Sequence, residues 1–413
     1  MDNYALPADE IVKDEAVDYE LAMAAPAAQS AAVATQFFKT HPNEIDLKEE
    51  GDSILFANKQ IDLEFVKGER SFQINRLYGI DQDHDFLTTE TVIGFRELFE
   101  IRMAPDIRGS GRDHRNASIR PGLMGIMNEM AADAFSVDTH SASSLSWKQS
   151  ESDGNATLHL HWNKIPVRGD KHVMDVEVTV TLSPGDPMSY WRINILNPGT
   201  QFGLERVRFP LLNLAPVGDP GNNVYIYPRE HGSYVEDPFN SAMGVNGFYP
   251  LNSSMQFNAL YDKVSGKGIY MATADSTPNL MQVQVANTPD HVTWKVAHFP
   301  PNITFAEESY WLPYDCVVGP FQGDWYDAAQ IYRKWAMKQT WCRKGPLLTR
   351  ADVPKWHKEA PFMFYTTIGD SAKGTHSLPE NARIAADHFR EYLQWATCPC
   401  RLTGTAGRNM SPA

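Results

Sequence analysis

Short runs of alternating apolar and polar residues dominate the chain from residue 53 to about residue 312. His172–Leu182 alternates at period two and stops at the turn signal 183–186, and Tyr190–Leu196 repeats the alternation. This pattern predicts half-buried β-strands. Further strands are predicted at 53–57, 60–65, 71–78, 224–227, 255–261, 268–274, 281–286 and 292–296. Because strands and turns recur with one helical stretch at 122–135, the pattern favours a mainly β fold built as a large two-layer antiparallel sandwich.

The hydrophobic period changes after residue 320. Apolar residues then recur at the i, i+3, i+4, i+7 spacing of one helix face, from Trp325 through Tyr332 to Ala336. This spacing predicts an amphipathic helix over 325–341. Asp324 is its predicted N-cap, because a short polar side chain there accepts a hydrogen bond from the first turn.

A third pattern begins at residue 360. The nearly continuous apolar run 360–368 predicts a buried strand, and a loop at 369–378 leads to a predicted helix with apolar residues such as Phe389 on one face. Strand, loop and helix make one β/α unit, as at the start of a parallel barrel. Because a barrel needs eight strands, the sequence predicts a barrel that is incomplete after its first β/α unit.

The two ends of the chain differ in composition from the rest. Residues 1–44 are acidic and alanine-rich, which predicts a disordered tail. Residues 396–413 contain no acidic residue, which indicates a tail foreign to the preceding sequence or a chain end. The predicted organisation is a disordered tail (1–44), a β-sandwich (45–315), a helical linker (316–350), the first β/α unit (351–395) and an atypical tail (396–413).

Acidic residues outnumber basic ones. Asp and Glu total 51 against 37 Lys and Arg, the formal charge is -14, and no run rich in Lys and Arg occurs. The electrostatic footprint of a nucleic-acid-binding protein is therefore missing. An acidic surface also disfavours anionic polysaccharides unless a local basic cleft exists, whereas neutral glycans remain open as ligands.

The four cysteines are too sparse for a disulfide framework, and the spacing of Cys398-Pro-Cys400 does not match a zinc or redox motif. The N-terminus shows no basic segment followed by an apolar one, and no run of eighteen apolar residues occurs. These features predict a cytoplasmic chain without a membrane segment, with a secreted parent as the alternative.

Three segments carry a family resemblance: Ser254–Asp262, Gly268–Asp275 and Gly319–Trp335. They resemble glycoside-hydrolase-like proteins in which a galactose-mutarotase-like β-supersandwich precedes a (β/α)8 barrel. The resemblance covers about residues 50–395, and Gly323–Ala329 is its most specific piece. It implies a carbohydrate-active protein that binds a neutral oligo- or polysaccharide and, as an enzyme, hydrolyses its glycosidic bonds. It also implies that the catalytic carboxylates follow later barrel strands, which are missing from this chain.

The loop 227–237 contains most of the candidate sugar contacts, because an arginine, several titratable residues and aromatic residues lie there between two predicted strands. The predicted substrate contacts are Arg229, Glu230, His231, Tyr234 and Tyr249. The candidate catalytic carboxylates are Glu230, Asp237 and, after the first barrel strand, Asp370. A polar connection with internal ion pairs explains the same loop, and Asp370 can equally cap a turn.

His159 and His161 share one face of a predicted strand. Such a pair can chelate zinc or copper, but it needs further ligands. A solvent-facing strand with Leu158, Leu160 and Trp162 inward explains the same alternation. No metal and no cofactor is therefore assigned from the sequence, and the histidine pair stays the weaker alternative.

Two other functions remain open at this stage. One is a non-catalytic glycan-binding or scaffolding module, which needs no barrel. The other is a metal-dependent enzyme on a β-fold, which rests on His159 and His161 alone. An incomplete barrel should also leave apolar surface around Phe362 and Phe364, which favours self-association.

Overall fold

The computed structural model describes residues 45–88, 97–106, 108, 134–229, 231–251, 253–277, 279–359, 364–366, 383, 387 and 402–404. The chain divides into two compact units, one of Glu15–Gln339 and one of Met1–Asp14 with Thr340–Ala413. The predicted mainly β fold with large antiparallel sheets is confirmed. The predicted tail 1–44 and most of the predicted helical stretch 122–135 lie outside the described residues.

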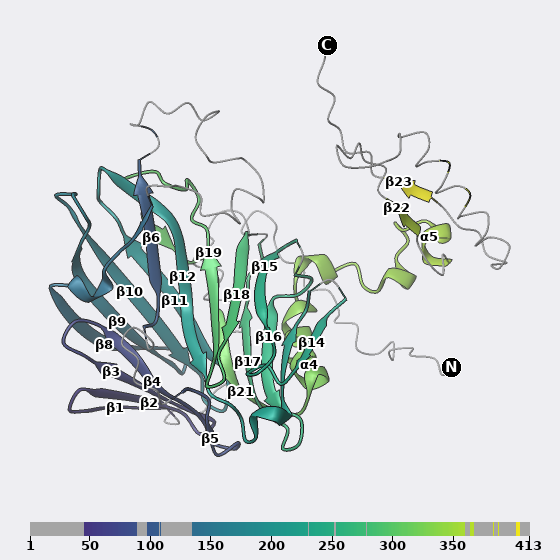
Figure 1. The fold of residues 1–413 in the computed structure, drawn as a ribbon, viewed down its shortest axis with the longest axis horizontal. Helices are drawn as coiled ribbons and strands as arrows, with labels where there is room; N and C mark the ends of the chain where they lie inside the picture. The colour runs from purple at the N-terminus through teal and green to yellow at the C-terminus, as the bar shows by residue number, and fades with distance from the viewer. Residues whose placement is uncertain are drawn as a thin grey trace, which may run out of the picture. The chain divides into compact units, whose positions relative to one another are not determined.

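The described part of the larger unit contains three antiparallel sheets (Figure 1). The small sheet consists of β1 (Asp46–Glu50), β2 (Ser53–Ala57), β3 (Ile61–Lys67), β4 (Phe72–Gly79) and β5 (His84–Asp85). The six-stranded sheet consists, in spatial order, of β15 (Gly244–Tyr249), β18 (Met281–Asn287), β19 (Val292–His298), β12 (Phe202–Leu214), β6 (Glu100–Pro105) and β7 (Phe135–Ser136).

The ten-stranded sheet forms the opposite layer. Its spatial order is β14 (Ser233–Glu236), β13 (Asn223–Tyr227), β16 (Phe257–Asp262), β17 (Lys267–Thr273), β21 (Cys316–Gln322), β11 (Ser189–Leu196), β10 (Val173–Leu182), β9 (Asn155–Pro166) and β8 (Ser144–Ser152), with β20 (Tyr310–Trp311) beside β11. Two 3-10 turns, η2 (Thr139–Ser141) and η3 (Pro220–Asn222), connect strands. Because β21 is a central strand, the sandwich extends past the predicted boundary at residue 315 to Gln322.

The inner face of the ten-stranded sheet packs on both other sheets through large aromatic rings. Phe65 of the small sheet lies against Trp191, with ring centroids 5.6 Å apart. Trp162 contacts Phe72 of the small sheet at 5.1 Å and Phe99, at the start of the six-stranded sheet, at 4.8 Å. One continuous core therefore lies between the layers, which matches a sandwich architecture.

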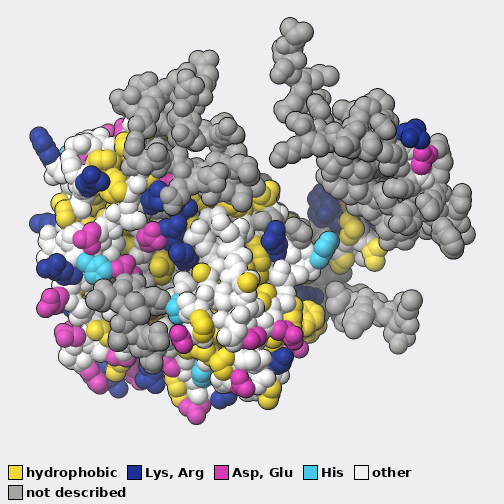
Figure 2. Space-filling model, in the orientation of Figure 1, with side chains coloured by type: hydrophobic (Ala, Val, Ile, Leu, Met, Phe, Trp, Pro, Cys, Tyr) yellow, Lys and Arg dark blue, Asp and Glu magenta, His cyan; other side chains and the backbone are white. Residues whose placement is uncertain are grey.

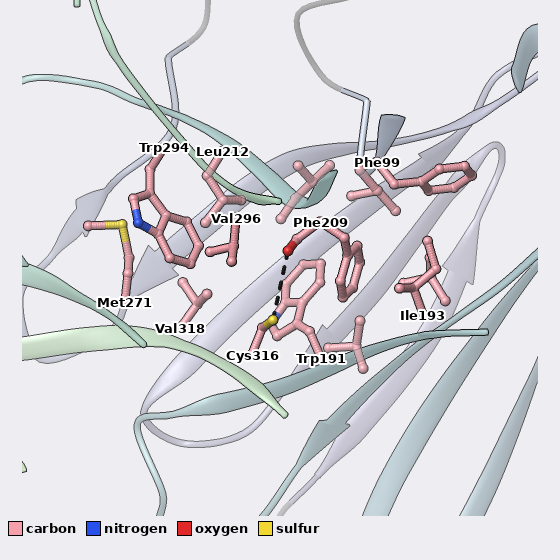
Figure 3. Packing of buried hydrophobic residues seen from close by; sticks show 14 of the residues in the cluster. Phe99, Trp191, Ile193, Phe209, Leu212, Met271, Trp294, Val296, Cys316 and Val318 are labelled. Carbon is pink, nitrogen blue, oxygen red and sulfur yellow. Dashed lines mark hydrogen bonds between the residues drawn. The ribbon is translucent and has the colours of Figure 1, made fainter. Parts of the chain in front are cut away.

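Cys316 belongs to this core. Figure 3 shows its thiol directed at Phe209 of the six-stranded sheet, and the thiol donates to the Phe209 carbonyl at 3.8 Å. Burial raises the pKa of the Cys316 thiol well above its usual value, so the thiol stays protonated and unreactive. Cys316 and Cys342 are both unpaired, and Cys398 and Cys400 lie outside the described residues.

The strands of the ten-stranded sheet are of two kinds. β9, β10 and β11 bury alternate residues, whereas β13, β16, β17 and β21 bury nearly every residue. The outer face of the second group carries Phe257, Tyr270 and Phe321, which pack with Ala328 and Tyr332 of helix α4 (Trp325–Ala336). The helix therefore covers one half of the outer face of the sheet.

Helix α4 begins where the sequence predicts. The Asp324 carboxylate accepts from the Tyr326 N–H at 2.7 Å, and the Asp327 carboxylate accepts from the Asp324 N–H at 3.0 Å. This reciprocal pair is a capping box, which satisfies N–H groups of the first helical turn. The helix ends at Ala336 and is shorter than the predicted range 325–341.

The described part of the smaller unit contains η4 (Thr340–Cys342), η5 (Leu347–Thr349), α5 (Lys355–Glu359), β22 (Phe364–Thr366) and β23 (Leu402–Gly404). β22 falls inside the buried strand predicted at 360–368 and pairs in parallel with β23. Parallel pairing requires a crossover connection, as in a β/α unit. Among the described residues of the whole chain, no helix has the length and apolar character needed to cross a membrane.

Candidate functional site

One row of side chains crosses the uncovered half of the outer face. The strand registers place Ser146 opposite His161, His161 opposite Glu177, Glu177 opposite Asn194, and Asn194 opposite Trp311. Neighbouring strands lie about 4.8 Å apart, so the step from His161 to Trp311 spans about 14 Å. We call these five residues the polar row.

Strand alternation explains why these side chains face outward. In β9, Leu158, Leu160 and Trp162 are fully buried, so His159 and His161 between them point to the opposite face. The same parity in β10 and β11 directs Glu177 and Asn194 outward. The inward arrangement predicted from the sequence for the apolar residues of β9 is therefore confirmed.

The two histidines and Glu177 form a tight cluster on this face. His159 Nδ1 lies 2.8 Å from Glu177 Oε1, and His161 Nε2 lies 3.5 Å from the same oxygen. The two imidazole rings stack with an interplanar angle of 6°. Asn194 Nδ2 donates to Glu177 Oε2 at 2.9 Å, and Ser150 Oγ lies 2.8 Å from His159 Nε2. Glu177 is thus held from both sides.

The electrostatics of the cluster follow from these contacts. The hydrogen bond with His159 lowers the pKa of Glu177 to about 2; that from Asn194 acts in the same direction, and partial burial opposes both. Burial lowers the pKa of His161 below its usual value, although the Glu177 charge opposes this effect. Glu177 is therefore a carboxylate at neutral pH, and burial favours the uncharged form of His161.

A shallow depression of about 240 Å³ lies over the polar row. It is lined by His161, Asn163, Asp175, Val176, Glu177, Asn194, Leu196 and Trp311. Trp311 is 59% exposed, so its indole ring is accessible from solvent. The depression therefore combines one exposed aromatic ring with carboxylate, amide and imidazole groups.

A charged pair lies beside the row toward the covered half. Arg192 on β11 donates through Nε to the Asp315 carboxylate. Burial raises the pKa of Asp315, and the Arg192 charge opposes that rise. Arg192 lies two positions before Asn194 on β11, and Asp315 directly precedes β21.

The loop predicted from the sequence lies at the end of the sandwich where β13 and β14 meet. Arg229 is exposed, and its backbone forms a bridge with Ser253, whose N–H donates to the Phe248 carbonyl at 2.9 Å. The loop thereby lies next to the end of β15, where Tyr249 is half-buried. The structure thus brings the predicted contacts Arg229 and Tyr249 to the same end of the sandwich.

The remaining predicted loop residues occupy ordinary positions in a hairpin. His231 is exposed in the turn, and Tyr234 is 51% exposed on β14. Glu236 pairs with Lys263 at 3.3 Å. The Asp237 carboxylate accepts from Asn240 Nδ2 at 2.9 Å and lies in a turn with positive φ. Asp237 therefore stabilises the turn after β14, and its catalytic role stays a prediction.

Glu230 and Asp370 lie outside the described residues, so their predicted roles remain untested. Conversely, the sequence analysis missed Glu177, Asn194 and Trp311. The alternation of β10 and β11 indicates which face Glu177 and Asn194 occupy. It does not indicate that they stand beside His161, because that depends on strand register.

A family model and a curated relative each match part of the chain by sequence. Residues 310–393 match the family "Domain of unknown function (DUF6259)". Over 153 residues, 35% of this chain and 12% of the relative, the sequence is 28% identical to the "Putative glycoside hydrolase 22789" of Monosiga brevicollis. These matches connect the chain by sequence to a glycoside-hydrolase-like protein.

A solved protein shares the fold. The α-N-acetylgalactosaminidase NagBb of Bifidobacterium bifidum aligns with 89% of this chain in its GalNAc complex, with a TM-score of 0.50 and 10% identity. Its Gal-NHAc-DNJ complex aligns with 87%, with a TM-score of 0.51 and 10% identity. This chain spans about half the length of NagBb, 51% in both cases. At this identity the likeness establishes a shared fold with a glycosidase.

Proposed function

We propose that this chain is a carbohydrate-active protein of the glycoside-hydrolase type, and that it binds a neutral glycan on the polar row. The observation that carries the proposal is the line of His161, Glu177, Asn194 and exposed Trp311 on adjacent strands. The sequence likeness to a glycoside-hydrolase-like relative supports the ligand class.

The row offers the two kinds of contact that a sugar ring needs. A pyranose has an apolar face of C–H groups and a rim of hydroxyls. The Trp311 indole provides a flat amphipathic surface for the apolar face. The Glu177 carboxylate accepts hydrogen bonds from hydroxyls, and the Asn194 amide can both donate and accept. A ligand with an apolar face and a rim of uncharged hydroxyls therefore fits both kinds of group in the row.

The charge of the site favours a neutral ligand. Glu177 is ionised at neutral pH because its pKa is lowered to about 2, and Asp175 also lines the depression. The net charge of the chain is -14. Figure 2 shows acidic and basic side chains interspersed over the visible described surface. An anionic sugar would therefore meet unfavourable charge at the row.

Hydrolysis is the finer part of the proposal. Most glycosidases use two carboxylates on either side of the scissile bond. Glu230, Asp237 and Asp370 are the candidates from the sequence. In the full chain, Glu230→Gln or Asp370→Asn should abolish turnover of an aryl-glycoside panel. If the chain turns over no glycoside, the alternative is favoured, namely a glycan-binding or scaffolding module.

Binding is tested by calorimetry on the full chain with neutral oligosaccharides, including ones that end in galactose or N-acetylgalactosamine. Trp311→Ala and Asn194→Ala should each weaken binding at least about tenfold, which corresponds to about 1.4 kcal/mol. Trp325→Ala is the matched control, because Trp325 is 50% exposed and lies outside the row. Unchanged affinity of Trp311→Ala, or no binding of any neutral sugar, would contradict the proposal.

A further inference from the structure

Three potential metal ligands converge on the outer face of β9 and β10. His159 Nδ1 and His161 Nε2 both face Glu177 Oε1, at 2.8 and 3.5 Å, and one donor atom from each residue lies within 4.8 Å of the others. The three side chains are 18%, 26% and 25% exposed, so an ion from solvent can reach them. Among the described residues, this is the cluster of His, Cys, Asp and Glu donors compact enough to hold an ion.

The donor set has a definite metal preference. Two imidazoles and one carboxylate suit divalent transition metals, and the same combination occurs in zinc sites that keep a fourth position open. Tetrahedral zinc with bonds of about 2.0–2.1 Å places its donors about 3.3 Å apart. The two short separations in the cluster, 2.8 and 3.5 Å, bracket that value. All three donor atoms lie within 4.8 Å of one another, which is close enough for one ion to be shared.

Neighbouring side chains orient the donors. Ser150 Oγ lies 2.8 Å from His159 Nε2, so the ring can donate from Nε2 once a metal displaces the Nδ1 proton that bonds Glu177 in the ion-free protein. Asn194 Nδ2 holds Glu177 Oε2 at 2.9 Å and leaves Oε1 directed at the histidines. Partners of this kind fix the tautomer and orientation of metal ligands, and their loss weakens metal binding about 10–100-fold.

We propose that His159, His161 and Glu177 bind one Zn²⁺ ion on the outer face of the sandwich. The site goes beyond the glycan contact proposed above, because metal binding can be measured without any sugar. The two sites share His161 and Glu177, whereas Trp311 belongs to the glycan contact alone. His161 and Glu177 also line the depression over the polar row.

The test uses the full chain, stripped with a chelator and then titrated with Zn²⁺ in calorimetry. Bound metal is counted by elemental analysis after gel filtration. The wild type should bind one equivalent of zinc, and His161→Ala and Glu177→Gln should each bind it at least about tenfold more weakly. Asn194→Ala should weaken binding about tenfold by releasing the carboxylate. Ca²⁺ should not compete, because it prefers oxygen donors.

His172→Ala is the matched control, because His172 is exposed and contacts Asp170 outside the cluster. Circular dichroism of each variant shows whether it is folded. Visible absorption of the Co²⁺-loaded protein gives a second readout, since four-coordinate cobalt absorbs strongly and should lose this band in Glu177→Gln. Zinc content that is unchanged in both His161→Ala and Glu177→Gln, or well below one equivalent in the wild type, overturns the proposal. Sugar binding by the chelator-treated wild type tests the glycan proposal separately.

Discussion

The outer face of the ten-stranded sheet has two halves with opposite properties. Over β13, β16, β17 and β21 it is apolar and covered by α4, with Ala328 and Tyr332 packed on Phe257 and its neighbours. Over β9, β10 and β11 it is polar, and it carries the row from His161 to Trp311. The inner face is apolar beneath both halves. One sheet thus serves as a packing surface at one end and presents, at the other, the polar surface that we propose as the glycan contact.

The sequences of the strands explain why one half is covered and the other is not. Strands that are covered on both faces need apolar residues at nearly every position, as Cys316–Gln322 shows. Strands that are covered on one face alternate, as Val173–Leu182 shows. A functional surface on a sheet is therefore expected where the alternation is cleanest and the outward residues are polar but half-buried.

The largest expected effect is a loss of folding stability when a residue of the covered half is replaced. Tyr332 is 8% exposed and stacks on Phe257 with ring centroids 5.4 Å apart. Tyr332→Ala should lower the free energy of unfolding by about 3 kcal/mol, because it leaves a cavity under α4. Tyr326→Ala on the same helix is the matched control, since Tyr326 is 56% exposed and should change stability by less than about 0.5 kcal/mol. Urea unfolding measures both, and equal losses would show that α4 does not stabilise the sheet.

Much of this fold could be predicted from the sequence. The predicted strand 53–57 coincides with β2, and the predicted strands 172–182 and 190–196 differ from β10 and β11 by one residue at the N-terminal end. Alternation fixes the side that each residue faces, and the polar Asp324 before an apolar stripe fixes the start of α4. These are local properties, and local pattern is sufficient to predict them.

The candidate site could be predicted only in part, because it depends on register. His159 and His161 are visible as a pair on one strand. Glu177 joins them because β10 pairs with β9 through a bulge between Met174 and Val176, which shifts the partners along the strand. Trp311 lies on a two-residue strand, which is too short for any periodic signal. The composition of the charged loop 227–237 predicts a site, yet Glu236 and Asp237 in this loop make local structural contacts.

A second prediction concerns the boundary between the two halves. Asp186 accepts hydrogen bonds from the Met188 N–H and from the Tyr190 hydroxyl, and burial raises its pKa to about 6. The unfolded carboxyl has a pKa of about 3.9. Between these values the folded chain binds more protons at Asp186 than the unfolded chain, so the contribution of this group to stability is largest below about pH 4 and is lost as pH rises through 6.

Asp186→Asn removes this titration and keeps the shape of the side chain. The difference in unfolding free energy between variant and wild type should therefore change by on the order of 2 kcal/mol between pH 4 and pH 7, in favour of the variant at pH 7. Urea unfolding at a series of pH values measures the slope. Parallel curves for the two proteins would show that the folded Asp186 carboxyl keeps an ordinary pKa.

The smallest expected effect is on the stability of the open half. Trp311 is 59% exposed, and β20 pairs with β11 through two residues only. Trp311→Ala should therefore change the free energy of unfolding by less than about 0.5 kcal/mol, in contrast to Tyr332→Ala. Thermal and urea unfolding of the ligand-free variant check this. A decrease in the free energy of unfolding near 2 kcal/mol would mean that the Trp311 ring stabilises the sheet. The two halves would then differ only in how much their side chains contribute to stability. A neutral result combined with weaker glycan binding would separate recognition from stability, because the ring would contribute to ligand contact alone.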